Sequence, residues 1–90
     1  MKPTRIYFLI GAKWFDKVNG NTYYNTKIIV VENNQVVSRS YSGFTYGYGL
    51  CYYSEVACEL KKQEGENYNQ LYVDGGCFYA TKREVKNAWF

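Results

Sequence analysis

Residues 5–15, RIYFLIGAKWF, and residues 23–31, YYNTKIIVV, decide the fold of this chain. Both stretches are rich in β-branched and aromatic residues, which favour extended strands. Residues 19–22 between them read Asn-Gly-Asn-Thr, and Asn-Gly supplies two positions that tolerate positive φ in a tight reversal. A second reversal at residues 33–34, Asn-Asn, leads into residues 35–46. The sequence therefore predicts three strands joined by two hairpins, which is an antiparallel meander.

Alternation along these strands predicts which side chains form the core. We expect one sheet face to hold the apolar set Ile6, Phe8, Ile10, Trp14, Ile28 and Val30. The opposite face would then carry rings and cations, namely Tyr7, Lys13, Tyr23, Lys27, Arg39 and Tyr41. A shift of the register by one residue would exchange the two faces. Gly11 interrupts the first strand, which is typical of a β-bulge.

A change of period near residue 53 predicts a central helix over residues 54–64. The apolar stripe at helical spacing consists of Tyr53, Val56, Ala57 and Leu60. Ser54 is expected to cap the start of this helix, because a hydroxyl can accept hydrogen bonds from the free amides of the first turn. Gly65 is expected to end it.

The last third of the chain is expected to add a hairpin and a short helix. Residues 68–73 and 77–80 have strand composition and flank Asp-Gly-Gly at 74–76, a reversal signal. Thr81 and Glu84 match a capping box, and the apolar residues Val85, Ala88 and Trp89 follow at helical spacing. Residues 1–90 are therefore predicted to form a single α+β domain. Its antiparallel sheet comprises a three-stranded meander plus a C-terminal hairpin, with one central helix and a short C-terminal helix.

The composition excludes several classes of catalytic site. The chain has 90 residues, 11 Lys and Arg against 8 Asp and Glu, a formal charge of +3 and no His. Ser-His-Asp catalysis, Cys-His catalysis and His-ligated zinc are thereby excluded. Its 3 cysteines form no CxxC pair, so we expect reduced thiols rather than a zinc ribbon or a disulfide framework. Glu55 and Glu59 lie one helical turn apart, but glutamates on a helix surface are normally solvated. We expect no enzyme, no cofactor and no metal site.

The N-terminal stretch does not resemble a membrane anchor or a signal peptide. The apolar run from Ile6 to Ile10 is far too short to span a bilayer. Lys13 and aromatic residues follow it, where a signal peptide would have small residues and a cleavage site. We therefore expect a cytoplasmic protein without membrane contact.

Two surfaces are candidates for binding, and the first is a nucleic-acid surface on the predicted polar sheet face. Its residues are Tyr7, Lys13, Lys27, Arg39 and Tyr41. Rings can stack on bases and cations can pair with phosphates, so this mixture suits RNA or single-stranded nucleic acid. The same residues also suit an ordinary solvated face, because Tyr favours strands and Lys and Arg keep an open sheet soluble.

The second candidate is a partner-binding surface on the glycine-rich aromatic segment 44–53. Its residues are Phe44, Tyr46, Tyr48, Tyr52 and Tyr53. Tyr is enriched in protein–protein contacts, and 11 tyrosines are too many to bury comfortably because each buried hydroxyl needs a partner. Several are therefore expected to form an exposed patch, which usually marks an interface. The alternative is that some of these rings cover the helix and complete the core.

The stretches GAKWFDKVNGNTYYNTKI and FTYGYGLCYYSEVACEL resemble a class of small uncharacterised proteins of bacteriophages and prophages. In that pattern a strand ends in Trp-Phe, a Gly-Asn-Thr-Tyr turn follows, and an aromatic-Gly-Tyr-Gly segment leads into a helix. The matching residues here are Trp14, Phe15, Gly20, Asn21, Thr22, Tyr23, Tyr46, Gly47, Tyr48, Gly49 and Tyr52. The pattern has an acidic residue after the second Gly, where this chain has Leu50, so no role of that acid is carried over.

This resemblance implies a phage-encoded interaction protein that binds and inhibits a host defence complex, as anti-CRISPR proteins do. The implied partner is a host protein or ribonucleoprotein complex, and self-association is a natural supplement for so small a core. The mildly basic charge argues against an acidic mimic of DNA. Two other hypotheses stay open: a module that binds RNA or single-stranded nucleic acid, and a binder of a small molecule or nucleotide at a subunit interface.

Overall fold

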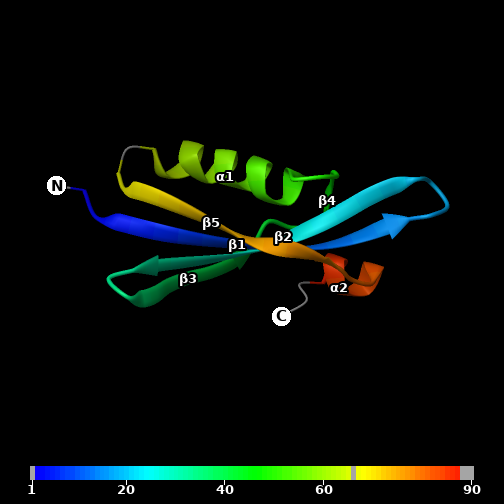
Figure 1. Ribbon diagram of the computed structural model, residues 1–90, viewed down its shortest axis with the longest axis horizontal. Helices are drawn as coiled ribbons and strands as arrows, with labels where there is room; N and C mark the ends of the chain where they lie inside the picture. The colour runs from blue at the N-terminus through cyan, green and yellow to red at the C-terminus, as the bar shows by residue number, and fades with distance from the viewer. Residues whose placement is uncertain (1, 66, 88–90) are drawn as a thin grey trace.

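The computed structural model describes residues 2–65 and 67–87, and its elements form an α+β fold (Figure 1). They are β1 (Thr4–Asp16), β2 (Asn21–Glu32), β3 (Gln35–Tyr41), β4 (Thr45–Tyr46), α1 (Cys51–Glu64), β5 (Asn69–Tyr79) and α2 (Lys82–Lys86). The strand order in the sheet is β3-β2-β1-β5, and β4 pairs with β2. The predicted fold class, with one central helix and one short C-terminal helix, is confirmed.

Both predicted hairpins of the meander are present. β1 and β2 pair antiparallel from Ile6↔Val31 to Asp16↔Asn21, so four residues form the connecting loop. The carboxylate of Asp16 orders this loop by accepting hydrogen bonds from the backbone N–H of Val18 at 3.0 Å and of Asn19 at 3.3 Å. The next turn has positive φ at both Asn33 and Asn34, as tight hairpin turns with right-handed strand twist require.

The predicted division of the β1 side chains between the two sheet faces is wrong. Tyr7 pairs with Val30 and Leu9 with Ile28, so these four side chains share one face. All four are buried, and Tyr7 and Leu9 are fully so. The expected core residues Ile6, Phe8, Ile10 and Trp14 point to the other face and are only partly buried. The faces are assigned by the pairing register, which the hydrophobic pattern of β1 alone could not set because both of its faces are apolar.

The predicted C-terminal hairpin is also wrong, because β5 is one continuous strand that runs parallel to β1. The register passes from Leu9↔Asp74 to Gly11↔Cys77, so β5 has one extra residue at Gly75-Gly76. This is a β-bulge beside Gly11, with the additional residue on the partner strand. The Asp74 carboxylate accepts from the backbone N–H of Gly76 at 2.8 Å. The Asp-Gly-Gly sequence therefore forms the bulge instead of a chain reversal.

The helix boundaries differ partly from those expected. α1 begins at Cys51, three residues early, and the hydroxyl of Ser54 donates to the carbonyl of Leu50 at 3.1 Å instead of capping the helix. Gly65 ends α1 as predicted, through its N–H to the carbonyl of Lys61. The expected third strand over residues 35–46 is divided into β3 and β4.

The capping box of α2 is confirmed. Thr81 accepts from the backbone N–H of Glu84 at 3.2 Å, and the Glu84 carboxylate accepts from the backbone N–H of Thr81 at 3.1 Å. Val85 is buried against the sheet. Ala88 and Trp89, the other apolar residues predicted for this helix, lie outside the described residues.

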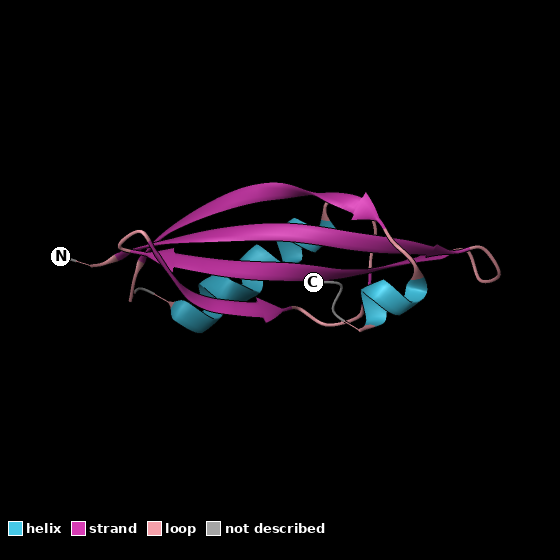
Figure 2. Ribbon diagram, turned by 90° about the horizontal axis from the view of Figure 1, so that it is seen from below, coloured by secondary structure: helices cyan, strands magenta, loops and turns pink. Residues whose placement is uncertain are grey.

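The two helices cover the sheet unequally. α1 lies along one face, called here the covered face (Figure 1). Its Tyr52, Val56 and Ala57 pack on Tyr7, Leu9, Tyr24, Ile28 and Val30 of the sheet to form the core cluster. The approach is close: a Cβ on Gly11 would lie 2.8 Å from the ring of Tyr52. α2 lies on the opposite face, near the end where β1 turns into β2, and leaves the rest of that face without a helix (Figure 2). We call this opposite face the open face.

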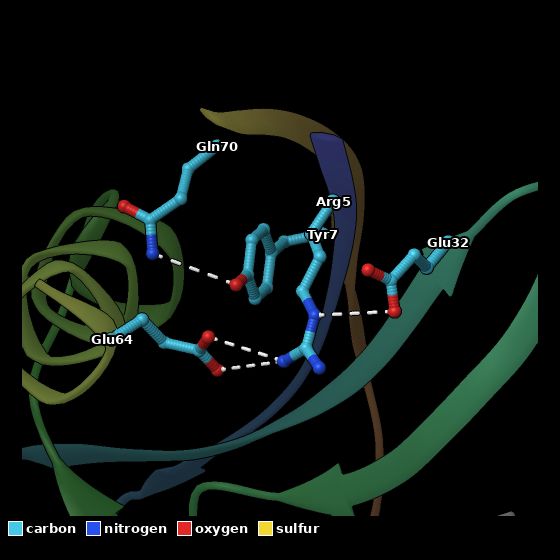
Figure 3. A network of polar contacts seen from close by, with 5 residues as sticks. All are labelled: Arg5, Tyr7, Glu32, Glu64 and Gln70. Carbon is cyan, nitrogen blue, oxygen red and sulfur yellow. Dashed lines mark hydrogen bonds and ion pairs between the residues drawn. The ribbon is translucent and has the colours of Figure 1, made fainter. Parts of the chain in front are cut away.

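A polar network holds the C-terminal end of α1 on the sheet (Figure 3). Nη1 of Arg5 donates to both carboxylate oxygens of Glu64, at 3.1 and 3.3 Å, and its Nε lies 3.8 Å from the carboxylate of Glu32. The guanidinium also lies 3.7 Å from the ring centroid of Tyr68. Arg5 thus connects β1 with β2, α1 and the segment before β5.

Candidate functional site

A row of aromatic side chains crosses the strands at the end of the sheet that carries β4. We call it the aromatic ridge, and it consists of Trp14, Tyr23, Phe44, Tyr46 and Tyr48. Tyr23 stacks on Trp14 with 6.0 Å between ring centroids, and on Phe44 with 4.8 Å. Tyr46 meets Tyr23 edge-on at 5.8 Å, and Tyr48 meets Tyr46 edge-on at 6.3 Å. The ridge is therefore one continuous set of ring contacts.

Strand pairing places the inner members of the ridge. Trp14 pairs with Tyr23, and Tyr23 pairs with Tyr46, so three neighbouring strands each present a ring on the open face. The segment that carries the outer rings lies close on the sheet, because a Cβ on Gly47 would be 2.6 Å from the ring of Tyr24. Only glycine at position 47 allows this approach, and the N–H of Gly47 is bonded to the carbonyl of Thr22 at 2.9 Å.

The base of the ridge is packed, and its outer rings are exposed. Both faces of Tyr23 are occupied, since Trp14 and Phe44 stack on it with interplanar angles of 23° and 10°. The ammonium group of Lys82 lies 5.3 Å from the Trp14 ring. Tyr46 is 54% exposed and Tyr48 is 68% exposed. A partner would therefore contact the exposed phenols of Tyr46 and Tyr48, which lie beside the stacked rings of the ridge.

The predicted partner-binding residues separate into two groups. Phe44, Tyr46 and Tyr48 come together in the ridge, at its exposed end. The prediction that Tyr52 belongs to an exposed patch is wrong, because Tyr52 is buried in α1 and its hydroxyl donates to the Asp74 carboxylate at 2.8 Å. Tyr53 is half-buried and packs against the core, which is the alternative stated for these rings.

Sequence reasoning missed two members of the ridge, Trp14 and Tyr23. Trp14 was expected in the core, and Tyr23 was placed on the polar face but not in the binding set. The hairpin between β1 and β2 contained the missing information. When a hairpin loop has an even number of residues, each odd-numbered residue of one strand pairs with an even-numbered residue of the other. Trp14 and Tyr23 are such a pair, so their rings had to be neighbours on one face.

The predicted nucleic-acid face does not exist as one surface. Tyr7 is fully buried and stacks on Tyr72 with 4.9 Å between centroids, so the expectation that it is exposed is wrong. Lys13 shares a face with Tyr7, since both are odd positions of β1, and its ammonium lies 4.6 Å from the ring of Tyr79. The remaining residues Lys27, Arg39 and Tyr41 do share the open face, through the pairs Lys27↔Tyr41 and Ile29↔Arg39.

A groove of about 410 Å³ lies between α1 and β3 on the covered face. Its apolar walls include Ile28, Val56 and Leu60, and carboxylates of Glu55 and Glu59 line it. The hydroxyl of Tyr24 donates to Glu55 at 3.0 Å. Burial, together with this hydrogen bond, raises the pKa of Tyr24 well above its usual range, so the phenol stays protonated.

The described acidic side chains and thiols form no further site. Within residues 2–65 and 67–87, no three side chains of Cys, Asp or Glu are grouped as a metal site would need. Cys51, Cys58 and Cys77 are free thiols, of which Cys58 is exposed. Burial raises the pKa of Cys77, which disfavours its reactive thiolate form.

Comparisons with known proteins add no relative. The chain matches no family model, and neither a curated protein nor a solved structure is significantly similar to it. Neither of the described helices is long and apolar enough to cross a membrane.

Proposed function

We propose that this chain is a non-enzymatic interaction protein that binds another protein through the aromatic ridge. The observation that carries the proposal is the exposure of Tyr46 and Tyr48 on a stacked base of Phe44, Tyr23 and Trp14. Tyr gives a large contact area at a low cost in side-chain entropy and adds a hydroxyl for hydrogen bonding. Rings held by their neighbours lose little further freedom on binding, which favours affinity.

The stacking geometry at Tyr23 argues against a base-stacking platform in the middle of the ridge. A base-stacking platform needs ring faces that are open to solvent. Tyr23 has none, because Trp14 and Phe44 occupy both of its faces. The exposed phenols of Tyr46 and Tyr48 are well suited to backbone and side-chain groups of a protein.

The identity of the partner rests on the resemblance to small phage proteins. On that basis we propose that the chain is phage-encoded and inhibits a host defence complex, as anti-CRISPR proteins do. Its partner would then be a host protein or a ribonucleoprotein complex. The formal charge of +3 fits a contact with an acidic or RNA-bearing complex better than mimicry of DNA.

The test is a pull-down from host lysate with the double variant Tyr46→Ala/Tyr48→Ala. Captured proteins and nucleic acids are identified by mass spectrometry and sequencing. The double variant should lose the specific partner and keep its melting curve, because both side chains are more than half exposed. The matched control is Tyr79→Ala, since Tyr79 is 76% exposed but lies outside the ridge. Retention of the partner by the double variant would show that the ridge is not the binding surface.

A second candidate function, binding of single-stranded nucleic acid, is favoured by the cations of the open face. Lys27 and Arg39 lie on this face, and α2 adds Lys82, Arg83 and Lys86 beside it. Electrophoretic shifts measured over a salt series test this function, because phosphate contacts weaken steeply as salt rises. Arg39→Ala should then reduce both the affinity and its salt dependence, whereas absence of a shift at low salt would eliminate this candidate.

A further inference from the structure

The groove between α1 and β3 exists because α1 lies toward the β5 side of the sheet. Among the described elements, α1 packs against β5, β1 and β2 but not against β3. Beside the buried Ile28, β3 contributes Ser40 to this space, since the two residues are register partners. A serine side chain is too small to fill it, and about 410 Å³ stays open beside the helix. This volume is within the size range of sites for small organic molecules.

The lining of the groove combines an apolar floor with an acidic wall. The apolar floor consists of Ile28, Val56 and Leu60. Glu55 and Glu59 form the wall, and within residues 2–65 and 67–87 neither carboxylate has an ion-pair partner. Lys61 and Lys62 follow in the last turn of α1 but lie outside the lining. The groove is therefore locally negative, although the whole chain has a formal charge of +3.

A buried phenol holds the first of the two carboxylates at the groove. Tyr24 is 3% exposed, and its hydroxyl donates to Oε2 of Glu55 at 3.0 Å. Residues four apart on a helix have Cβ atoms about 5–6 Å apart, so the carboxylates of Glu55 and Glu59 are neighbours on the wall and repel each other. One ammonium group between them can donate to both, because each charge-assisted hydrogen bond spans about 2.8 Å.

We propose that this groove binds a small organic ammonium ion with an apolar body. The ammonium group lies between Glu55 and Glu59, and the apolar body lies on the floor of the groove. A metal ion fits the lining less well, because calcium takes about six or more oxygen ligands and the described residues bring no three acidic side chains together. The site is on the covered face, so it is separate from the aromatic ridge and independent of the proposed protein partner.

Titration of the isotope-labelled protein with 4-phenylbutylamine tests the site, with amide chemical shifts in nuclear magnetic resonance spectra as the readout. For a probe of about eleven non-hydrogen atoms, we expect a dissociation constant of roughly 0.1 to 1 mM. The shifts should concentrate at residues 40–42 and 55–63, which border the groove. The matched probe 4-phenylbutanol has the same apolar body without the charge. It should bind about tenfold more weakly or less, because it offers the carboxylates no charge-assisted hydrogen bond.

Variants separate the two parts of the site. Glu55→Gln and Glu59→Gln keep the size of each side chain, and each should weaken binding of the amine about tenfold while leaving the alcohol unchanged. Ser40→Phe places a ring in the groove and should weaken both probes. The matched control is Val18→Lys, which changes the net charge by the same amount at a loop residue that is 91% exposed and outside the lining. It should bind the amine like the natural chain.

Several outcomes would overturn the proposal. Equal affinity for amine and alcohol would show that the carboxylates do not select the ligand. The same shifts with calcium or magnesium alone would make this a metal site. A loss in Val18→Lys as large as in the Gln variants would reduce the effect to net charge. Tyr46→Ala/Tyr48→Ala should bind the amine normally even where it loses the pull-down, so failure of the groove and failure of the ridge are distinguishable.

Discussion

Aromatic residues are held by hydrogen bonds on the covered face of the sheet and by ring contacts on the open face. Under α1, buried tyrosines direct their hydroxyls to polar partners: Tyr24 donates to Glu55 and Tyr52 donates to Asp74. On the open face, Tyr23 is held by ring contacts, stacked on Trp14 and Phe44 and edge-on to Tyr46. A chain rich in tyrosine can therefore build much of its core from it when polar groups from other elements accept from the buried phenols. The aromatic rings that no helix covers stay at the surface.

The largest expected difference between the two faces is in the free energy of unfolding lost when a leucine of each face is replaced by alanine. Leu9→Ala removes a fully buried side chain under α1 and should lower the free energy of unfolding by about 3 kcal/mol. Leu71→Ala, at a side chain that is 55% exposed, should cost about 1 kcal/mol or less. Urea titration measures both. Equal losses would mean that α1 does not distinguish the two faces energetically.

Two tyrosine hydroxyls on the covered face differ in hydrogen bonding, so removing each should change stability differently. Tyr52→Phe removes a hydrogen bond to the Asp74 carboxylate and should cost about 2 kcal/mol. The buried hydroxyl of Tyr72 has no hydrogen-bond partner among the described residues, so Tyr72→Phe should leave stability unchanged or raise it by up to about 1 kcal/mol. Both variants keep their rings, which makes each a control for the packing of the other. A destabilised Tyr72→Phe would reveal a partner for that hydroxyl.

Local signals in the sequence predicted the elements but not how they combine. The strands around Asn-Gly, the turn at Asn33-Asn34, the stop at Gly65 and the Thr81 capping box all depend on neighbours a few residues away. Each is a short-range effect of backbone geometry or hydrogen bonding, so composition and spacing were sufficient.

The two main errors have long-range causes. β1 is apolar on both faces, so only its pairing with β2 identifies Tyr7 and Leu9 as core. The Asp-Gly-Gly signal at 74–76 predicted a reversal, yet the Asp74 carboxylate is held by the hydroxyl of Tyr52 from α1 and the strand continues past a bulge. No residue near position 74 carries that information. The candidate site was predictable only in part. The aromatic composition of segment 44–53 indicates Tyr46 and Tyr48, whereas Trp14 joins them only through the pairing register of β1 with β2.

A smaller effect is expected at α2, the only helix on the open face within the described residues. Thr81→Ala removes the side-chain acceptor of the capping box and should cost about 1 kcal/mol. Thr81→Ser keeps the hydroxyl and serves as the control. The loss should appear in the urea midpoint and in weaker amide-exchange protection around Val85, which packs on this face. An unchanged midpoint would show that α2 contributes little to the stability of the sheet.

The last effect is absent at neutral pH and appears only in alkali. Burial, reinforced by the hydrogen bond to Asp74, raises the pKa of Tyr52 to about 12, and burial raises the pKa of Tyr72 to about 12. In the unfolded chain a phenol titrates near pH 10. The folded state therefore binds more protons than the unfolded state between about pH 10 and 12, and stability falls as pH rises through this window.

Urea titrations at several pH values between about 8 and 11 measure this slope, with the ionisation of tyrosine followed by ultraviolet absorbance. Stability that depends on these two phenols should be fully present below about pH 10 and decline above it. The double variant Tyr52→Phe/Tyr72→Phe should show a shallower decline, because neither ring can then ionise. A double variant whose decline is as steep as that of the natural chain would assign the alkaline transition to other groups, first of all to Tyr24, whose pKa burial also raises.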